Sequence, residues 1–143
     1  MSYLPTGISV PKPLPDGLDR EAFNRLARHR LAVRRCADCG TWQWPPEVIC
    51  HECRGFALTW EDVAPAGYVF SWTRIWHPVR PVLRGAVPYV VVLVELPAAG
   101  NVRLIGNLLG SAGQSVRVGD SVTGVYEDHD EGFTLLQWQK SGR

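Results

Sequence analysis

Four cysteines, the only ones in the chain, form two C-x-x-C pairs that are separated by ten residues. The pairs are Cys36 with Cys39 and Cys50 with Cys53. Each pair can place two thiolates on one tight turn, and together they supply the tetrahedral S4 shell that is typical of structural zinc. Because such a shell leaves no position open for water or substrate, we expect one structural Zn²⁺ per chain, held by a zinc ribbon over residues 34–60.

The same cysteines permit two other interpretations. Two disulfides would require an oxidising compartment, but residues 1–5 lack the basic and apolar regions of a signal peptide. We therefore expect a cytoplasmic protein with reduced thiols. Iron in a rubredoxin-like S4 site is the second alternative, which a colourless, zinc-containing protein would exclude. His51 lies inside the second pair, and because the shell is already complete we expect it to be a bystander.

Two segments precede the cysteines. Residues 1–15 contain four prolines, which exclude a helix, and we expect an extended proline-rich tail. Residues 16–33 are predicted to contain the N-terminal helix, and both Asp16 and Asp19 are placed to cap its start. Apolar side chains recur at helical spacing and form one stripe, made up of Leu18, Ala22 and Leu26.

Residues 61–143 are rich in Val, Tyr, Phe, Trp and Thr, in short runs separated by glycine, proline or acidic turn residues. Five such strands suit a small closed barrel, of which the OB-fold is the commonest form, although composition alone does not separate it from an SH3-like barrel. We therefore predict a mainly β protein with an N-terminal helix, a rubredoxin-like zinc ribbon and a C-terminal five-stranded OB-fold barrel. The predicted strands span residues 68–76, 89–96, 102–109, 121–126 and 133–140.

A twelve-residue loop, residues 77–88, separates the first two predicted strands. It is far longer than a tight hairpin and is apolar with two arginines. Long apolar loops tend to be covered, by a ligand or by another subunit. The alternative is that the loop folds back and plugs one end of its own barrel. His77 is the histidine best placed for chemistry, because it lies where the strand meets the loop.

Six tryptophans occur in a chain of 143 residues, and tryptophan is enriched at protein interfaces. Trp42 and Trp44 alternate in the sequence and should lie on one side of a small hairpin. We predict that these two side chains, together with Val82 and Leu83 of the long loop, contact a protein partner.

The net charge is only +1, with an isoelectric point of about 7.7, so the chain lacks the strong positive field of proteins that bind phosphate backbones. A single-stranded nucleic-acid-binding module is nevertheless the main alternative function, because zinc ribbons and OB barrels both occur in that role. Phe70, Trp72 and Trp76 would then form an aromatic row on one face of a strand. No apolar run is long enough to cross a bilayer, and we expect no membrane association.

The sequence gives little support to an independent enzyme. It contains no G-x-S-x-G, H-E-x-x-H or G-x-x-x-x-G-K-[ST] motif. With every cysteine assigned to metal, no thiol is left as a nucleophile. The four histidines lie in different segments, and we assign no catalytic residue to this chain.

Several local motifs occur in a fixed order along the chain. They are RCADCG at residues 35–40, PP at 45–46, GYVFSWT at 67–73, PYVV at 88–91, VEL at 94–96 and VGDSV at 118–122. In these motifs and in its order of helix, four-cysteine ribbon and five-stranded barrel, the chain resembles the DUF35 family of zinc-ribbon OB-fold proteins that are associated with acyl-CoA chemistry. The resemblance covers residues 16–140, which is nearly the whole chain.

This resemblance implies a non-catalytic accessory subunit of a thiolase-superfamily enzyme that acts on acyl-CoA or acyl-carrier substrates, such as an acyltransferase, a condensing enzyme or a steroid side-chain retro-aldolase. The partner would hold the catalytic residues, and its own dimeric state suggests a heterotetramer. The ribbon would bridge subunits and the barrel would cover the partner's acyl channel. Arg80 and Arg84, together with His77, are the candidate contacts for the phosphates of acyl-CoA, because guanidinium groups pair well with phosphate.

Overall fold

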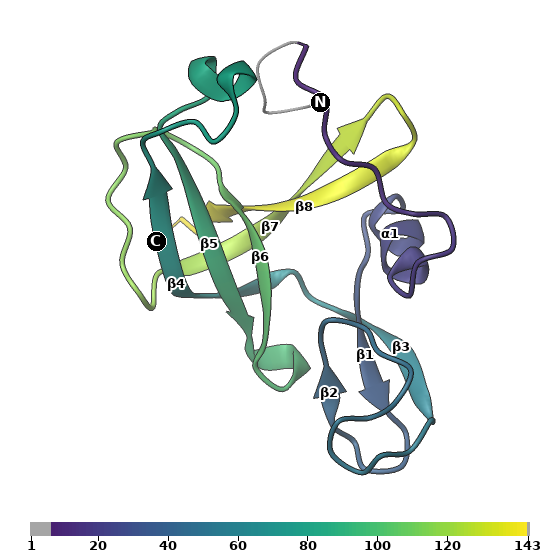
Figure 1. Ribbon diagram of the computed structural model, residues 1–143. Coiled ribbons are helices and arrows are strands. Elements are labelled where there is room, and N and C mark those ends of the chain that lie inside the picture. The colour runs from purple at the N-terminus through teal and green to yellow at the C-terminus, as the bar shows by residue number, and fades with distance from the viewer. Residues whose placement is uncertain (1–6, 143) are drawn as a thin grey trace.

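Two β-sheets and one short α-helix make up the computed structural model, which describes residues 7–142 (Figure 1). A small three-stranded sheet projects from one side of a five-stranded barrel, and the helix lies beside the junction. This arrangement confirms the predicted fold class. Within the described residues, no helix is long and apolar enough to cross a membrane.

Helix α1, Arg20–Leu26, is shorter than the sequence pattern predicts. Asp19 occupies the N-cap position, as expected, but its side chain makes no capping hydrogen bond. The backbone of this residue, with φ −90° and ψ 0°, is outside the extended region that a capping side chain requires. Ala22 and Leu26 are buried, whereas Leu18, the first member of the predicted apolar stripe, is 54% exposed.

The helix ends in a Schellman motif that has histidine at the left-handed position. His29 has φ 55°, and its N–H donates to the carbonyl of Leu26 at 2.8 Å. The N–H of Arg30 donates to the carbonyl of Arg25 at 3.0 Å, which completes the motif. The His29 ring stacks on Tyr126 with centroids 4.8 Å apart, so the end of the helix is fastened to the barrel by the residue that terminates it.

The ribbon sheet consists of β1 (Leu31–Cys36), β2 (Trp42–Gln43) and β3 (Leu58–Val63), in the order β2-β1-β3. Both pairings are antiparallel. The sheet therefore joins residues on both sides of the two cysteine pairs, and the pairing of Cys36 with Leu58 lies at its metal-binding end. Sequence patterns did not predict β3, because its short run of mixed residues forms a strand only when β1 is beside it.

The five barrel strands that the sequence predicts are confirmed. Their bounds are β4 Ala66–Ile75, β5 Tyr89–Leu96, β6 Val102–Leu108, β7 Ser121–His129 and β8 Phe133–Lys140. Strand β7 runs three residues further than predicted. The strands close in the order β4-β5-β6-β8-β7, with a parallel pairing between β6 and β8 at Leu108 and Trp138 and antiparallel pairings elsewhere.

The helix, the ribbon and the barrel share one hydrophobic core. Alternate residues of β5 point inward and are buried, and Trp138 of β8 fills the centre with 0% exposure. Leu26 of the helix and Leu31 and Val33 of β1 belong to the same cluster of buried side chains. The ribbon is therefore packed against the barrel and is more than a tethered appendage.

The connection between the two sheets is short. Only Ala64 and Pro65 separate β3 from β4. The carbonyl of Pro65 accepts a hydrogen bond from the N–H of Gly124 in β7, and a Cβ atom at residue 124 would lie 2.7 Å from the Pro65 ring. The link is thereby held against a third strand, which leaves the ribbon little freedom to swing.

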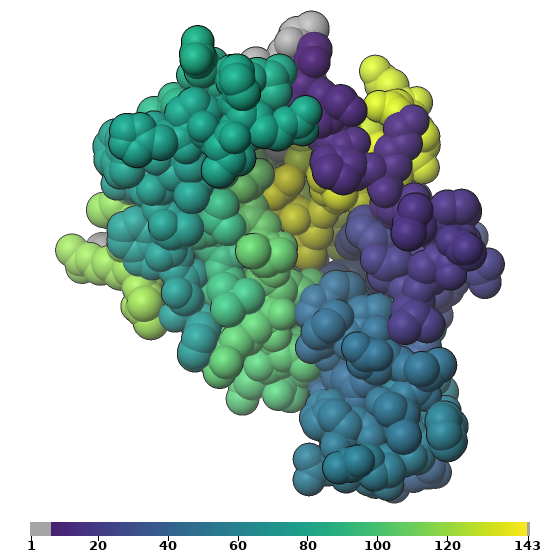
Figure 2. All heavy atoms as spheres, in the orientation of Figure 1, coloured from purple at the N-terminus to yellow at the C-terminus, as the bar shows by residue number. Residues whose placement is uncertain are grey.

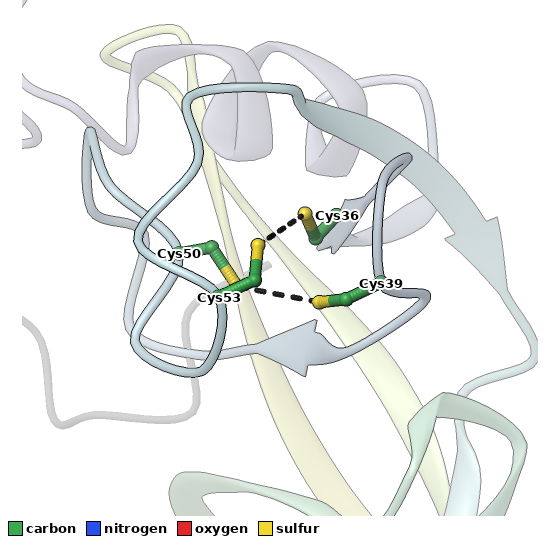
Figure 3. A group of neighbouring side chains, drawn as sticks. All are labelled: Cys36, Cys39, Cys50 and Cys53. Atoms are coloured by element: carbon green, nitrogen blue, oxygen red, sulfur yellow. Dashed lines mark hydrogen bonds between the residues drawn. The ribbon is translucent and has the colours of Figure 1, made fainter.

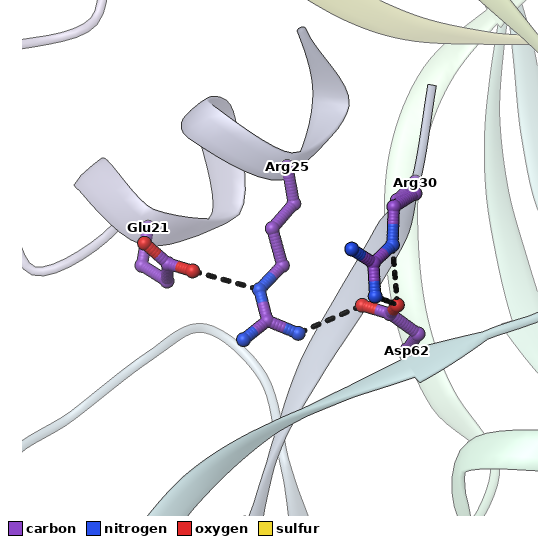
Figure 4. A network of polar contacts seen from close by, with 4 residues as sticks. All are labelled: Glu21, Arg25, Arg30 and Asp62. Atoms are coloured by element: carbon purple, nitrogen blue, oxygen red, sulfur yellow. Dashed lines mark hydrogen bonds and ion pairs between the residues drawn. The ribbon is translucent and has the colours of Figure 1, made fainter. Parts of the chain in front are cut away.

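A polar network joins the helix to the ribbon (Figure 4). The Arg25 guanidinium donates to Glu21 and to Asp62 of β3, each at 2.8 Å. Arg30 donates to the other carboxylate oxygen of Asp62 through its Nε at 2.6 Å. Hydrogen bonds from Arg25 and then from Arg30 hold the pKa of Asp62 below its ordinary value.

Residues 7–15 contain neither helix nor strand and pass beside the β7–β8 hairpin (Figure 1). Lys12 forms an ion pair there with Glu131 in the hairpin turn. The rest of the predicted proline-rich tail, residues 1–6, lies outside the described residues.

Candidate metal centre and interaction surfaces

The first cysteine pair lies on a turn at the end of β1. The N–H of Cys36 donates to the carbonyl of Thr41 at 2.9 Å, and the N–H of Gly40 donates to the carbonyl of Cys36 at 2.8 Å. Gly40 has φ 76°, in the left-handed region that glycine adopts without strain. Glycine at this position therefore lets the chain make the tight turn that brings the two cysteines together.

The second cysteine pair repeats the hydrogen-bond pattern of the first. The N–H of Cys50 donates to the carbonyl of Gly55 at 2.8 Å, and the N–H of Arg54 donates to the carbonyl of Cys50 at 3.0 Å. Here the left-handed position is occupied by Arg54, with φ 63°, and not by glycine. Two knuckles of equal geometry thus face each other, and one of them carries a strained non-glycine residue.

The four sulfur atoms converge on one point from the two knuckles (Figure 3). Cys36 and Cys53 have sulfur atoms 3.6 Å apart, those of Cys39 and Cys50 are 3.7 Å apart, and all four lie within 4.8 Å of one another. Four sulfurs at about 2.3 Å from one zinc ion would be about 3.8 Å apart, so the spacing fits a tetrahedral zinc shell. The cysteines are free rather than disulfide-bonded. The site is that of one structural zinc.

The electrostatics of the cluster favour a cation. Hydrogen bonding with the Thr41 side chain and backbone lowers the pKa of Cys39 to about 6. The Gly55 N–H also favours a thiolate at Cys53, but the neighbouring Cys36 and Cys39 sulfurs outweigh it and raise the pKa of Cys53 to about 12. Four thiolates this close repel one another, so a bound divalent cation is what allows all of them to be deprotonated together.

Gln43 lies on β2, directly after the first knuckle, and its side chain forms hydrogen bonds with the second knuckle. This side chain is 4% exposed, donates to the carbonyl of Ile49 at 3.0 Å and accepts from the N–H of His51 at 2.9 Å. The His51 ring also faces the Gln43 oxygen, at 2.9 Å, and the metal-ligating cluster of the described residues contains the four cysteines alone. This placement agrees with a bystander role for His51.

Trp42 and Trp44, the predicted partner contacts of the ribbon, are half-buried and pack against the chain's own core. The Trp42 ring lies on Gly100, and the Arg35 guanidinium lies 5.1 Å from the centre of the Trp42 ring. Both tryptophans therefore have an intramolecular role at the junction of ribbon and barrel. Their contact with a partner stays a prediction.

The long loop, residues 77–88, contains a 3-10 helix, η1, over Pro81–Gly85. His77, Arg80 and Arg84 are all exposed, and Arg80 directly precedes η1 while Arg84 lies in its last turn. Within residues 7–142 neither arginine makes an ion pair with another side chain. Their assignment to a ligand stays a prediction.

Some apolar residues of this loop are exposed to solvent and others are half-buried. Val79 and Val82 are 81% and 46% exposed. Leu83 and Ala86 are half-buried and line a cavity against β5, β6 and the β7–β8 hairpin. The loop thus covers part of its own chain with one side and presents apolar side chains to solvent with the other.

The prediction that Phe70, Trp72 and Trp76 form an aromatic row on one face of β4 is wrong. A β-bulge between Val69 and Ser71 leaves Phe70 without a partner residue and shifts the alternation of the strand. Trp72 consequently pairs opposite Val92, a core residue, whereas Phe70 is on the other face of the strand; their side chains are 37% and 41% exposed. The aromatic side chains are therefore distributed over two faces.

Arginines near these aromatic side chains are already engaged. Arg103 lies 3.5 Å from the centre of the Phe70 ring and makes an ion pair with Glu95 at 3.0 Å. Arg74 lies 5.7 Å from the centre of the Trp72 ring, and its guanidinium donates to the carbonyl of Gln114. These guanidinium groups stabilise the barrel surface and do not line an open basic groove.

Two buried polar residues were missed by sequence reasoning. Glu127 and Gln137 are 2% and 6% exposed, and both line the cavity beneath η1. Glu127 directly follows the predicted strand 121–126 and begins a run of acidic residues, which is typical of an exposed turn. That signal does not identify the site, because the cover is supplied by segments far away in the chain.

Comparisons with known proteins agree with this geometry. Residues 23–59 match the family model for the ChsH2 rubredoxin-like zinc ribbon domain, and residues 60–127 match that for the ChsH2 C-terminal OB-fold domain. Two curated relatives are each called "DUF35 domain-containing scaffold protein". The relative from Methanothermobacter thermautotrophicus is 29% identical over 69% of this chain and 73% of its own. The relative from Methanocaldococcus jannaschii is 28% identical over 73% and 76%.

Solved structures give the same result. A chain described as "Ltp2-ChsH2(DUF35) aldolase" is 31% identical, with a TM-score of 0.78 over 90% of this chain and 98% of that one. A protein of unknown function from Sulfolobus solfataricus, assigned to DUF35, is 18% identical and shares the fold, with a TM-score of 0.62 over 88% and 87%. With its four-cysteine zinc ribbon packed on an OB-fold barrel, the chain belongs to the DUF35 family.

Proposed function

We propose that this chain is a non-catalytic accessory subunit that binds and completes a thiolase-superfamily enzyme acting on acyl-CoA or acyl-carrier substrates. The observation that carries the proposal is the 31% identity to the chain described as "Ltp2-ChsH2(DUF35) aldolase", which names a DUF35 protein together with a second protein in an aldolase. The description of two relatives as scaffold proteins supports the same role. A heterotetramer with a dimeric thiolase-like partner, in the reducing cytoplasm that zinc thiolates favour, is part of the proposal.

The tip of the ribbon is one surface that supports docking. Val48, Ile49 and Phe56 flank the second knuckle and are 62%, 39% and 76% exposed. Zinc binding fixes the knuckle that carries them, so their positions are set before a partner arrives. Exposed apolar side chains on a rigid support are suited to a protein interface, because little conformational entropy is lost on binding.

The long loop is the second surface. Val82 and Leu83, with Trp42 and Trp44 of the ribbon, are the proposed partner contacts, and Arg80, Arg84 and His77 are the proposed contacts for acyl-CoA. Within the described part of the chain the two guanidinium groups are exposed and lack carboxylate partners, which leaves them available to phosphates.

The decisive experiment is capture of a candidate thiolase-like subunit from the same organism by the tagged, zinc-loaded chain. We expect a stable complex and a gain in the partner's turnover. Phe56→Asp or Val82→Asp should weaken capture at least tenfold, whereas Val118→Asp, at a residue that is 69% exposed on another loop, should not. Arg80→Glu with Arg84→Glu should raise KM for the acyl-CoA and leave capture unchanged. If the purified pair fails to associate, the proposed function is wrong.

The alternative, a module for single-stranded nucleic acid, has weaker support. The aromatic side chains of β4 are divided between two faces, and the arginines beside them are bonded within the chain. A titration with single-stranded DNA at low salt tests this alternative directly, because phosphate contacts are strongest there. We expect no saturable binding.

A further inference from the structure

Each C-x-x-C pair of the metal centre contains one buried and one exposed cysteine. Cys36 and Cys50, the first members of the two pairs, are buried, whereas Cys39 and Cys53, the second members, are exposed. The four sulfur ligands of one zinc ion therefore differ in their access to solvent, although the shell that they form is closed.

The ribbon holds this metal centre away from the rest of the chain. Figure 2 shows the ribbon as a blue lobe that projects beyond the barrel, and in this view no other segment covers its outer end. The residues that flank the second knuckle are open to solvent as well, since Val48 and Phe56 are 62% and 76% exposed. A small water-soluble reagent can therefore reach the exposed cysteines without any opening of the fold.

Two close sulfur contacts join the knuckles, and each contact pairs an exposed cysteine with a buried one. The sulfur of Cys53 lies 3.6 Å from that of Cys36, and the sulfur of Cys39 lies 3.7 Å from that of Cys50 (Figure 3). The two contacts use every cysteine once. Each exposed sulfur thus has a buried sulfur of the other knuckle beside it, as a redox-sensitive cysteine has a resolving cysteine beside it.

We propose that the metal centre is also a site of reversible oxidation, at which hydrogen peroxide converts the four thiolates into two disulfides and the zinc ion is released. The disulfides join Cys36 with Cys53 and Cys39 with Cys50, so neither lies within a C-x-x-C motif. Metal binding keeps all four cysteines in the thiolate form, which is the form that reacts, and oxidation follows thiolate character and exposure. The inference concerns the free chain and does not depend on the thiolase-like partner.

The reaction balances with peroxide as its sole oxidant. The sulfur of an exposed cysteine attacks one peroxide oxygen, the O–O bond breaks, hydroxide leaves and a sulfenic acid forms. The buried thiolate beside it attacks the sulfenic sulfur, the S–S bond forms and a second hydroxide leaves. Two protons from solvent convert the hydroxides into water, so each disulfide consumes one peroxide. A disulfide is no longer a metal ligand, because the ligand has to be a thiolate.

Limited alkylation tests the difference in access between the cysteines. The full, zinc-loaded chain is treated briefly with iodoacetamide, and mass spectrometry quantifies the modified positions. We expect Cys39 and Cys53 to react at least tenfold faster than Cys36 and Cys50. The matched control is the same chain unfolded in guanidinium with a chelator, in which the four rates should differ by less than threefold. Equal rates in the folded, zinc-loaded chain would overturn the proposal.

Titration with hydrogen peroxide tests the stoichiometry, with the released zinc measured by a coloured chelator that takes up no zinc before peroxide is added. We expect complete release at about two equivalents of peroxide per chain, because each disulfide uses one. Addition of a dithiol reductant and zinc ions should restore the bound metal. Retention of zinc in excess peroxide overturns the proposal, and so does release that the reductant fails to reverse.

The sequence allows the pairing of the cysteines to be determined directly. Asp38, Glu47 and Glu52 lie between successive cysteines, so cleavage at aspartate and glutamate places each cysteine in a separate fragment. Free thiols are alkylated first, and mass spectrometry then identifies the linked fragments. We expect the two linkages between the knuckles that the sulfur contacts define. Linkage within the C-x-x-C pairs, any other dominant pairing, or sulfinic acid in place of disulfides overturns the proposal.

Discussion

The indole ring of Trp42 packs directly on Gly100, so closely that a Cβ atom at residue 100 would lie 2.7 Å from Trp42 Cδ1. Gly100 has φ 61° and ends the short 3-10 turn between β5 and β6. The contact therefore joins the second ribbon strand to the barrel at a position that only glycine fits without strain.

Gly100→Ala should lower the free energy of unfolding by about 2–4 kcal/mol, because left-handed strain and overpacking against the indole act together. Urea unfolding of the zinc-loaded protein measures the loss. Gly113→Ala is the control, since a Cβ atom there meets nothing within 4 Å, and it should change stability by less than about 0.5 kcal/mol. Trp42→Leu should recover part of the Gly100→Ala loss. Strictly additive losses would contradict the direct contact.

Substitutions at the left-handed residues of the two zinc knuckles should change the stability of the ribbon in opposite directions. Arg54→Gly removes left-handed strain and should stabilise the ribbon by about 1 kcal/mol, whereas Gly40→Ala introduces the same strain and should destabilise it by a similar amount. Competition for zinc with a chelator and urea unfolding both report the change. A loss of stability in Arg54→Gly would show that the arginine side chain makes a contact worth more than the strain.

His29→Gly should destabilise the protein by about 1 kcal/mol, although glycine is the preferred residue at a left-handed helix end. The reason is that the imidazole stacks on Tyr126 and places its Nε2 2.9 Å from Asp128, and both contacts are lost. Thermal unfolding measures the effect. His29→Asn, which tolerates the backbone conformation but cannot stack, should also be destabilised. A gain of stability in the glycine variant would mean that the stack contributes less than the strain.

Removal of zinc should unfold the ribbon and leave the barrel strands largely in place. Cys36 is 1% exposed, so Cys36→Ser removes a buried ligand as well as a thiolate. Zinc-finger peptides gain roughly 10–16 kcal/mol of apparent binding energy from their metal, and this energy is folding energy. Elemental analysis, circular dichroism and partner capture should report lost metal, retained β signal and lost capture. Normal capture by metal-free protein would contradict a docking role for the ribbon.

Asp62→Asn should make the free energy of unfolding less dependent on pH at acidic pH. Arg25 and Arg30 hold the pKa of Asp62 below 3.8, so the folded protein binds this proton less readily than the unfolded chain. The resulting stabilisation is present above pH 3.8 and is lost as pH falls through the lower pKa of the folded state. Urea midpoints measured from about pH 5 to pH 2 should fall less steeply in the variant. The exposed turn residue Asp130, replaced by Asn, serves as control and should leave the slope unchanged.

The order of elements and the metal ligands could be predicted because their signals are local. Two C-x-x-C pairs specify a cluster through spacing alone, and the run of β-forming residues in 89–96 identifies β5 wherever it packs. The bulge at Phe70 has no such signal, since it depends on the strand opposite. The left-handed backbone of Arg54 in the second knuckle likewise has no signal in the sequence, because this conformation is ordinarily occupied by glycine.

The cavity residues were beyond the reach of the sequence for a different reason. Glu127 and Gln137 lie on strands whose alternation gives the face but not its environment. That face is covered by residues near 10 and near 83–86, which are distant in the chain. Only the three-dimensional structure brings them together, and a charged residue in a strand would ordinarily be assigned to solvent.

Just two residues connect β3 to β4, and the carbonyl of Pro65 accepts a hydrogen bond from β7. The connection between the zinc-binding end of the ribbon and the barrel is therefore short and held in place. We therefore expect the ribbon and the barrel to move as one body, so that a subunit bound at the tip would turn the barrel with it. A conformational change in a subunit bound at the ribbon would in this way be transmitted to a subunit bound at the far end of the barrel.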